Sequence, residues 1–221
     1  MKYLLGLIGA ITLCLLTYLN IIYPVEWHWI FTVLIIYTGV VKIIESFFTS
    51  KEKDALKYSG DWTLILTSVL YFISGVLIII EFFFFNKDQN TPIVILGLIV
   101  YFLAIVLRYY SIKILGNQWA IHVIKESKLQ NENVLISEGP YKYIRHPIYL
   151  SYVLDLLGIA LISGTYYSII FIILINLPSY VLRAMYEEHI SKQRFGKKFI
   201  EYVSTTSFMI TIPSIRGNKK R

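Results

Sequence analysis

Charged side chains are scarce in this chain, and cysteine is almost absent. Of the 221 residues only 16% are charged, whereas 56% are hydrophobic and the mean hydropathy is +0.61. A soluble globular domain has about a quarter of its residues charged, so this composition argues against an ordinary soluble domain. The single cysteine, Cys14, excludes an intrachain disulfide, and we interpret it as a packed apolar side chain.

Two patterns typical of soluble cofactor and metal sites are also missing. No Gly-x-Gly-x-x-Gly run follows a strand pattern, so we expect no Rossmann domain. No group of His, Cys, Asp and Glu has the spacing of metal ligands, so we expect no metal site. Three histidines are scattered and are interpreted as surface or interface residues: His28, His122 and His189.

Long apolar runs dominate the chain. A helix needs about 20 apolar residues to cross a bilayer. Four runs reach this length, and two shorter runs flank a break at Ser163-Gly164-Thr165, which predicts a membrane-embedded hairpin. We therefore predict an all-α, polytopic integral membrane protein with about six membrane-embedded helices, the first a retained anchor. The predicted spans are Leu4–Tyr23, His28–Phe48, Trp62–Phe85, Thr91–Tyr110, Tyr149–Ser163 and Tyr166–Leu182.

Basic residues are distributed unevenly, and this predicts the orientation. The loops at residues 24–27 and 86–90 hold only Lys87 between them. With six crossings, the other loops, the N-terminus and the basic tail all fall on one side. The positive-inside rule makes that side cytoplasmic, with both termini inside. Because the basic tail follows the last membrane segment, we expect it to meet anionic lipid headgroups and not nucleic acid.

The most informative run is Gly-Pro-Tyr-Lys-Tyr-Ile-Arg-His-Pro-Ile-Tyr at residues 139–149, which leads from a polar stretch into an apolar segment. Placing Arg145 and His146 at a membrane boundary costs free energy unless they have partners. Downstream, Arg183 and Glu187 are four residues apart where the last span leaves the membrane, so they share a helix face. The two motifs together indicate a site for a polar ligand.

Each motif alone also has a purely structural interpretation. Pro147 suits the first position of a helix, and Arg145 could bind lipid phosphates. Arg183 and Glu187 could form a solvated ion pair.

One acidic residue lies inside the fifth apolar segment. Such residues are candidates for function by default. We expect Asp155 to pair with Asn176 across the hairpin, and the sequence assigns it no further role.

The motifs together resemble those of the isoprenylcysteine carboxyl methyltransferases and their phospholipid methyltransferase relatives. The resemblance covers about residues 95–213. It implies an integral membrane enzyme that transfers a methyl group from S-adenosylmethionine to a lipophilic acceptor. The leading candidate for the reaction is isoprenylcysteine-type carboxyl O-methylation. The motifs that carry it are Leu115-Gly116-x-x-Trp119, Gly139-Pro140-Tyr141, Arg145-His146-Pro147-Ile148-Tyr149, Arg183, Glu187-Glu188, Phe195-Gly196 and Tyr202.

The resemblance also implies roles for individual residues. Glu187 would hold a polar or cationic part of the cofactor, and Arg183 would face the substrate. A carboxylate acceptor is already ionised, whereas an amine or thiol would have to be unprotonated or lose a proton. Tyr141, His146 or Glu187 could take that proton, and the sequence does not choose among these. The implied cofactor site comprises Asn133, Val134, Leu135, Ile136, Tyr141, His146, Pro147, Ile148, Tyr149 and Glu187.

The motifs divide the chain into N-terminal membrane helices (1–90) and a methyltransferase-like region (91–221) with a cytoplasmic loop (111–146) and a basic tail (183–221).

Two other classes of protein stay open: an NADPH-dependent membrane reductase of the sterol-reductase type, and a transporter or scaffold without catalysis. The acceptor is also open among prenylcysteine, phospholipid amine and small thiol. The Ile-, Lys- and Asn-rich composition favours a microbial plasma membrane.

Overall fold

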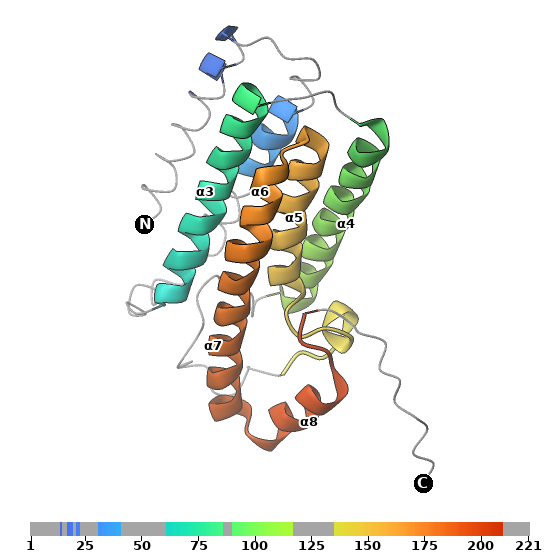
Figure 1. Cartoon of the computed structure of the whole chain (residues 1–221). Coiled ribbons are helices and arrows are strands. Elements are labelled where there is room, and N and C mark those ends of the chain that lie inside the picture. Colours follow the sequence, from blue (N-terminus) through green and yellow to red (C-terminus); the bar gives the residue numbers. More distant parts are fainter. Residues whose placement is uncertain are drawn as a thin grey trace.

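The protein is seen in a computed structural model that describes residues 14, 17–19, 21–22, 31–40, 61–85, 90–116 and 135–209. Long helices run side by side in one bundle, and a short helix folds back across its end (Figure 1). The predicted all-α fold is confirmed, since the described part has one isolated β-bridge and no strand. Its elements are a helix over Phe31–Val40, α3 (Trp62–Phe85), α4 (Thr91–Leu115), the 3-10 turn η3 (Gly139–Lys142), α5 (Pro147–Ser163), α6 (Tyr166–Phe171), the π-helical turn η4 (Ile172–Asn176), α7 (Leu177–Phe195) and α8 (Lys197–Thr205).

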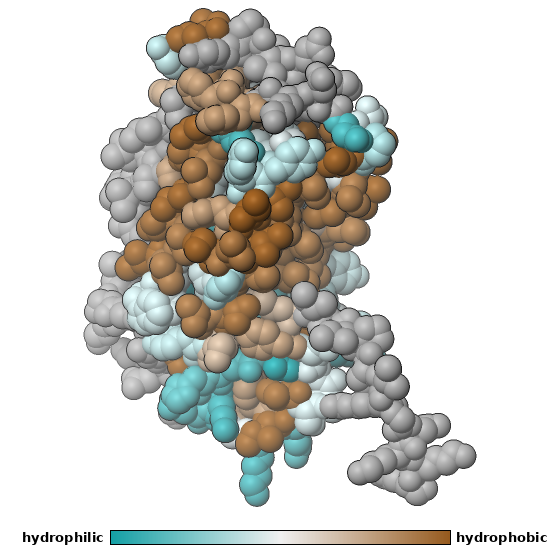
Figure 2. Space-filling model, viewed as in Figure 1, coloured by the Kyte–Doolittle hydropathy of each residue, from teal (hydrophilic) through white to brown (hydrophobic). Residues whose placement is uncertain are grey.

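The outer face of the bundle is suited to lipid. Three helical runs in the described chain are long and apolar enough to cross a membrane: α3, α4 and the continuous run Tyr166–Phe195. Large apolar side chains point outward from them, for example Ile65, Leu103 and Ile173. Figure 2 shows a broad hydrophobic band at mid-height and hydrophilic residues at the end that carries α8. Because water cannot solvate so large an apolar surface, the chain is an integral membrane protein.

The predicted spans agree closely with the helices where both can be compared. α3 matches its predicted run at both ends, whereas α4 continues to Leu115 and the last helix to Phe195. Both extensions contain polar residues. The helices continue through them because helical backbone hydrogen bonds do not depend on apolar side chains. Most of Leu4–Tyr23 and much of His28–Phe48 lie outside the described residues, so the number of crossings stays a prediction.

α4 and α5 cross at backbone contact. A Cβ atom on Gly97 would lie 2.8 Å from the backbone nitrogen of Ile162, and one on Gly158 would lie 2.8 Å from that of Tyr101. Small residues allow helices to approach this closely inside a membrane. The contact fixes the height of α5 against α4, and with it the position of the first turn of α5.

α3 is fastened to the last helices at both of its ends. At one end, Glu81 accepts hydrogen bonds from the backbone nitrogens of Tyr167 (2.9 Å) and Ser168 (2.7 Å), which caps the start of α6. At the other end, Asp61 pairs with Arg183 of α7. Buried side chains of α3, α5 and η4 form one core between these points, including Ile78, Phe82, Val153, Leu156 and Ile172.

The expected pairing of Asp155 with Asn176 is wrong. Asp155 faces α4, where its Oδ2 atom accepts a hydrogen bond from Arg108 and another from Tyr71 (2.9 Å). Asn176 lies in the π-helical turn and donates to the hydroxyl of Ser74 on α3. The two residues belong to adjacent helices but to different faces of the hairpin, which apolar periodicity alone does not distinguish.

Candidate functional site

The motif residues meet at the end of the bundle where α5 begins and α7 ends (Figure 1). After α8 the chain returns and pairs with the segment that precedes α5. The backbone nitrogen of Arg145 donates to Ser207 O (2.9 Å), that of His146 to Phe208 O (3.2 Å), and that of Ser207 to Tyr143 O (3.0 Å). The Arg-His-Pro motif is therefore held in place by residues far downstream in the sequence.

His146 stands immediately before α5 and is 7% exposed. Its Nε2 atom lies 3.0 Å from Glu188 Oε1, and its Nδ1 atom lies 3.7 Å from Glu187 Oε2. Burial alone would lower the pKa of His146, but the hydrogen bonds and charges of Glu187 and Glu188 outweigh it and raise that pKa above its usual value. The cationic imidazolium is thus favoured between the two carboxylates.

The two adjacent glutamates differ in how accessible they are. Glu188 accepts a 2.6 Å hydrogen bond from Arg145 Nε in addition to its contact with His146, and its side chain is 21% exposed. The side chain of Glu187 is 40% exposed. Glu188 therefore serves to hold Arg145 and His146, whereas Glu187 presents a carboxylate that a ligand can reach.

Arg183 is buried behind these groups, with 3% of its side chain exposed. Its Nη2 atom lies 3.3 Å from Asp61 Oδ2, its Nη1 donates to Thr63 Oγ1 (3.3 Å) and its Nε to the Tyr149 hydroxyl (3.1 Å). Tyr149 in turn stacks on the ring of His146, with centroids 5.6 Å apart. Arg183, Tyr149 and His146 thus form a continuous row.

The partners Asp61 and Thr63 were not found from the sequence. Asp61 precedes α3, and its carboxylate also accepts a hydrogen bond from the backbone nitrogen of Leu64 (3.1 Å), as a helix-capping residue does. From the neighbouring sequence alone, Asp61 would be interpreted only as a helix cap. The signal available in the sequence is an acidic residue at the same membrane boundary as Arg183.

Tyr141 lies buried in η3, and its carbonyl accepts a 2.7 Å hydrogen bond from the Tyr202 hydroxyl. Burial, together with the charges of Glu187 and Tyr202, raises the pKa of Tyr141 far above its usual value. Burial also raises the pKa of Tyr202 to about 12. Both phenols therefore stay protonated, so Tyr141 is better suited to donating a hydrogen bond than to accepting a proton.

The remaining predicted cofactor residues lie on the approach to this site. Leu135 and Ile136 are half-buried in the chain that leads into η3, and Gly139 there has φ +54°, with Ile114 filling the space that a Cβ would need. Pro147 is buried and Ile148 half-buried in the first turn of α5. Asn133 and Val134 lie outside the described residues.

The fold and the candidate site define a class: membrane-embedded helical proteins with a cluster of paired charged side chains where a helical hairpin begins. The phospholipid methyltransferase family matches residues 92–198, nearly half of the chain, from α4 into α8. The family resemblance drawn from the motifs is therefore confirmed over this stretch.

Two relatives are informative. Protein-S-isoprenylcysteine O-methyltransferase B of Arabidopsis thaliana is 30% identical over 106 residues, which are 48% of this chain and 53% of the relative, so the match spans about half of that protein. The solved structure of a eukaryotic intramembrane Ras methyltransferase, an isoprenylcysteine carboxyl methyltransferase, superposes with a TM-score of 0.55 at 18% identity. That likeness covers 96% of this chain and 86% of the other, and it shows that the fold is shared.

Proposed function

We propose that this protein is an integral membrane methyltransferase that uses S-adenosylmethionine and methylates a lipophilic acceptor, most simply the carboxylate of an isoprenylcysteine. The family match over residues 92–198 and the activity named for the Arabidopsis relative support this proposal. The observation that carries it is the half-exposed Glu187 carboxylate beside the buried His146, at the end of the bundle that the family motifs build. A reductase or a transporter is not favoured by these relatives.

Glu187 and His146 carry opposite charges, so together they fit a ligand that is cationic at one point and anionic at another. Glu187 would hold the sulfonium or ammonium charge, and the imidazolium of His146 would favour the carboxylate end. When bound, the cofactor supplies an activated methyl group, and the chain's residues orient the reactants and exclude water. The proposed cofactor-binding residues are Asn133, Val134, Leu135, Ile136, Tyr141, His146, Pro147, Ile148, Tyr149 and Glu187.

The protonation states favour a carboxylate acceptor over an amine or a thiol. A carboxylate is ionised at neutral pH and needs no general base. An amine or thiol would have to lose a proton, but Tyr141 and His146 are both held in their protonated forms by the surroundings described above. Burial would raise the pKa of Glu187, but the hydrogen bond and charge of His146 outweigh it and lower that pKa, so the Glu187 carboxylate is only a weak base. Arg183 is held by Asp61 and Tyr149, and its guanidinium would orient the acceptor carboxylate through charge-assisted hydrogen bonds and not through an unmatched charge.

The arrangement relative to the membrane is also part of the proposal. Both termini are cytoplasmic, and the site lies at the inner surface of a microbial plasma membrane, where basic residues meet anionic lipids. Residues 91–221 form the methyltransferase region, and residues 1–90 contribute Asp61 and Thr63, which hold Arg183.

The direct test is methyl transfer from labelled S-adenosylmethionine by the purified full chain in nanodiscs. The acceptors compared are a prenylcysteine, phosphatidylethanolamine and an alkyl thiol. We expect label in the prenylcysteine as a base-labile methyl ester. Transfer only to the amine or the thiol would replace the acceptor, and binding of NADPH in place of S-adenosylmethionine would overturn the reaction class.

A binding measurement tests the site itself. His146→Ala should weaken S-adenosylmethionine binding by about ten- to a hundredfold or more, because a charge-assisted hydrogen bond is lost. Lys142→Ala should bind normally, since Lys142 is exposed. Calorimetric titration of both variants decides between these outcomes, and equal affinities would contradict the assignment of His146.

A further inference from the structure

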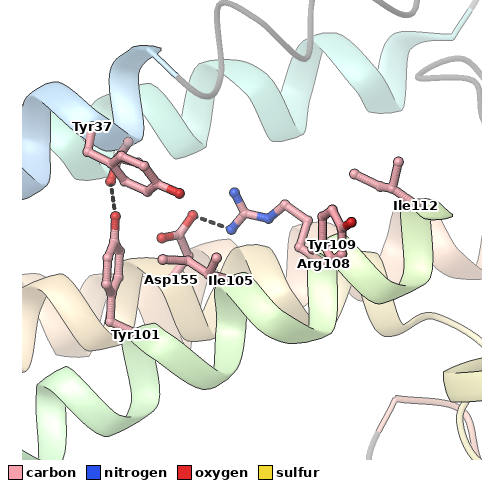
Figure 3. Close-up of a pocket in the computed structure, with 8 residues that line it drawn as sticks. Tyr37, Tyr101, Ile105, Arg108, Tyr109, Ile112 and Asp155 are labelled. Carbon is pink, nitrogen blue, oxygen red and sulfur yellow. Dashed lines mark hydrogen bonds and ion pairs between the residues drawn. The ribbon is translucent and has the colours of Figure 1, made fainter.

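A cavity lies in the membrane region, away from His146. It has a volume of about 180 Å³ and opens between the helix Phe31–Val40 and α4 (Figure 3). Tyr37 and Tyr109 are 45% and 65% exposed, so the cavity can be reached from the lipid-facing surface. None of its lining residues belongs to the proposed methyltransferase site. They are Tyr37, Thr38, Tyr101, Ile105, Arg108, Tyr109, Ile112 and Asp155.

The Asp155 carboxylate lies at the floor of the cavity and can accept further hydrogen bonds. Asp155 is 1% exposed, and its Oδ2 atom accepts hydrogen bonds from Arg108 and Tyr71. Within the described ranges, no donor reaches its Oδ1 atom. Figure 3 shows this second oxygen turned toward Tyr101, whose hydroxyl is bonded to Thr38 (2.7 Å). Asp155 lines the cavity, so a ligand hydroxyl there can donate a hydrogen bond to this oxygen.

The chemistry of the walls limits what the ligand can be. Arg108 already neutralises Asp155, so a cationic ligand has no net charge to meet. Ile105, Ile112 and the tyrosine rings offer apolar contacts. The volume equals that of about six water molecules, enough for the polar end and first carbons of a lipid. Arg108 lies two turns before the end of α4, about 10 Å from it, which is below the headgroup level.

We propose that this cavity binds a lipid alcohol, a neutral single-chain amphiphile that carries a hydroxyl group. The hydroxyl donates to Asp155 Oδ1, and the chain leaves past Tyr37 and Tyr109 into the bilayer. The site is separate from the proposed methyltransferase site and does not depend on its reaction.

The test uses the full chain in nanodiscs with two photoreactive probes: a diazirine-bearing hexadecanol and its methyl ether. The ether keeps the chain and the oxygen but cannot donate a hydrogen bond. We expect the alcohol to label residues 101–112, with competition by unlabelled hexadecanol. Labelling by the ether should require about ten- to a hundredfold more probe, because the bond to a carboxylate is lost.

A matched pair of variants locates the site. Ile105→Phe fills the cavity without touching the charge pair, whereas Val106→Phe adds the same bulk on the adjacent position, which is exposed. Labelling should fall in the first variant and persist in the second. Equal labelling by alcohol and ether would mean that the cavity takes any acyl chain and would overturn the proposal. Absent labelling would mean that the cavity holds only water. Labelling that Ile105→Phe leaves unchanged would mean that the probe binds outside the cavity. Either result would overturn the proposal.

Discussion

At the scale of single residues, three arginines in the described bundle are matched to carboxylates on other elements. The charges lie in or near a medium where an unpaired ion is costly, so each pair must be complete before the site is stable. The partners come from distant parts of the sequence, and this ties the motif helix to the rest of the bundle. The pairs are Arg108 with Asp155, Arg145 with Glu188 and Arg183 with Asp61.

Asp61→Asn should be strongly destabilising, because it leaves the Arg183 charge buried without its carboxylate. The expected loss is about 3–5 kcal/mol of unfolding free energy. The double variant Asp61→Asn, Arg183→Gln should lose less than the sum of the two single changes, with a coupling of about 0.5–3 kcal/mol. Denaturant unfolding of the four proteins in one detergent measures this cycle. Additive losses would show that the pair is not coupled.

The raised pKa of His146 gives the stability a definite pH dependence. The folded state binds the proton more tightly than the unfolded state, whose reference value is 6.5. The stabilisation is therefore complete below about pH 6.5 and is lost as the pH rises through the folded-state pKa. Thermal unfolding at pH 6 and pH 8.5 should show lower stability at the higher pH. His146→Gln should remove this part of the difference, and an unchanged difference would assign it to another group.

At the scale of elements, the α4–α5 crossing depends on the absence of a side chain at Gly158. Gly158→Ala would place its Cβ 2.8 Å from the Tyr101 backbone and should cost about 1–3 kcal/mol. Gly75→Ala on α3 has nothing within 4 Å and should stabilise by about 0.5–1 kcal/mol. Comparing the two melting temperatures checks this, and a neutral Gly158→Ala would mean that the helices separate without cost.

The helices were easier to predict from the sequence than the side-chain contacts between them. Apolar length is a local property, so Trp62–Phe85 was predicted at both ends. The face that each helix turns to its neighbours is set by packing, so Asp155 was paired with Asn176 when its partner is Arg108. Arg108 lies inside a predicted span, and a charge at that depth is itself a signal for a partner.

The sequence likewise predicted one part of the candidate site and missed another. The motif run and Glu187 do come together around His146, because both motifs stand at the ends of predicted spans on the same side. The burial of Arg183 was not predicted, since Asp61 reaches it across the bundle from a helix outside the matched region. Spacing along one helix shows which residues share a face but not what covers that face.

At the scale of the whole molecule, the predicted topology can be tested by accessibility. Single cysteines at Asn90 and Asn218, in a Cys14→Ser background, should be labelled from opposite sides of the membrane by an impermeant thiol reagent. The reason is the scarcity of basic residues in the loops at 24–27 and 86–90. Labelling of both positions from the same side would contradict the proposed orientation.

The pairing of the Arg-His-Pro segment with the chain after α8 has a consequence for how the protein assembles. Arg145 bonds to the carbonyl of Thr206, 61 residues later, and the intervening chain forms the whole hairpin and α8. Helices insert on local information, whereas this contact closes a long loop and must wait for both segments. The order of events is therefore insertion of the helices first and completion of the candidate methyltransferase site last. Hydrogen exchange should accordingly find the amides of Arg145 and His146 opening well before those at the α4–α5 crossing.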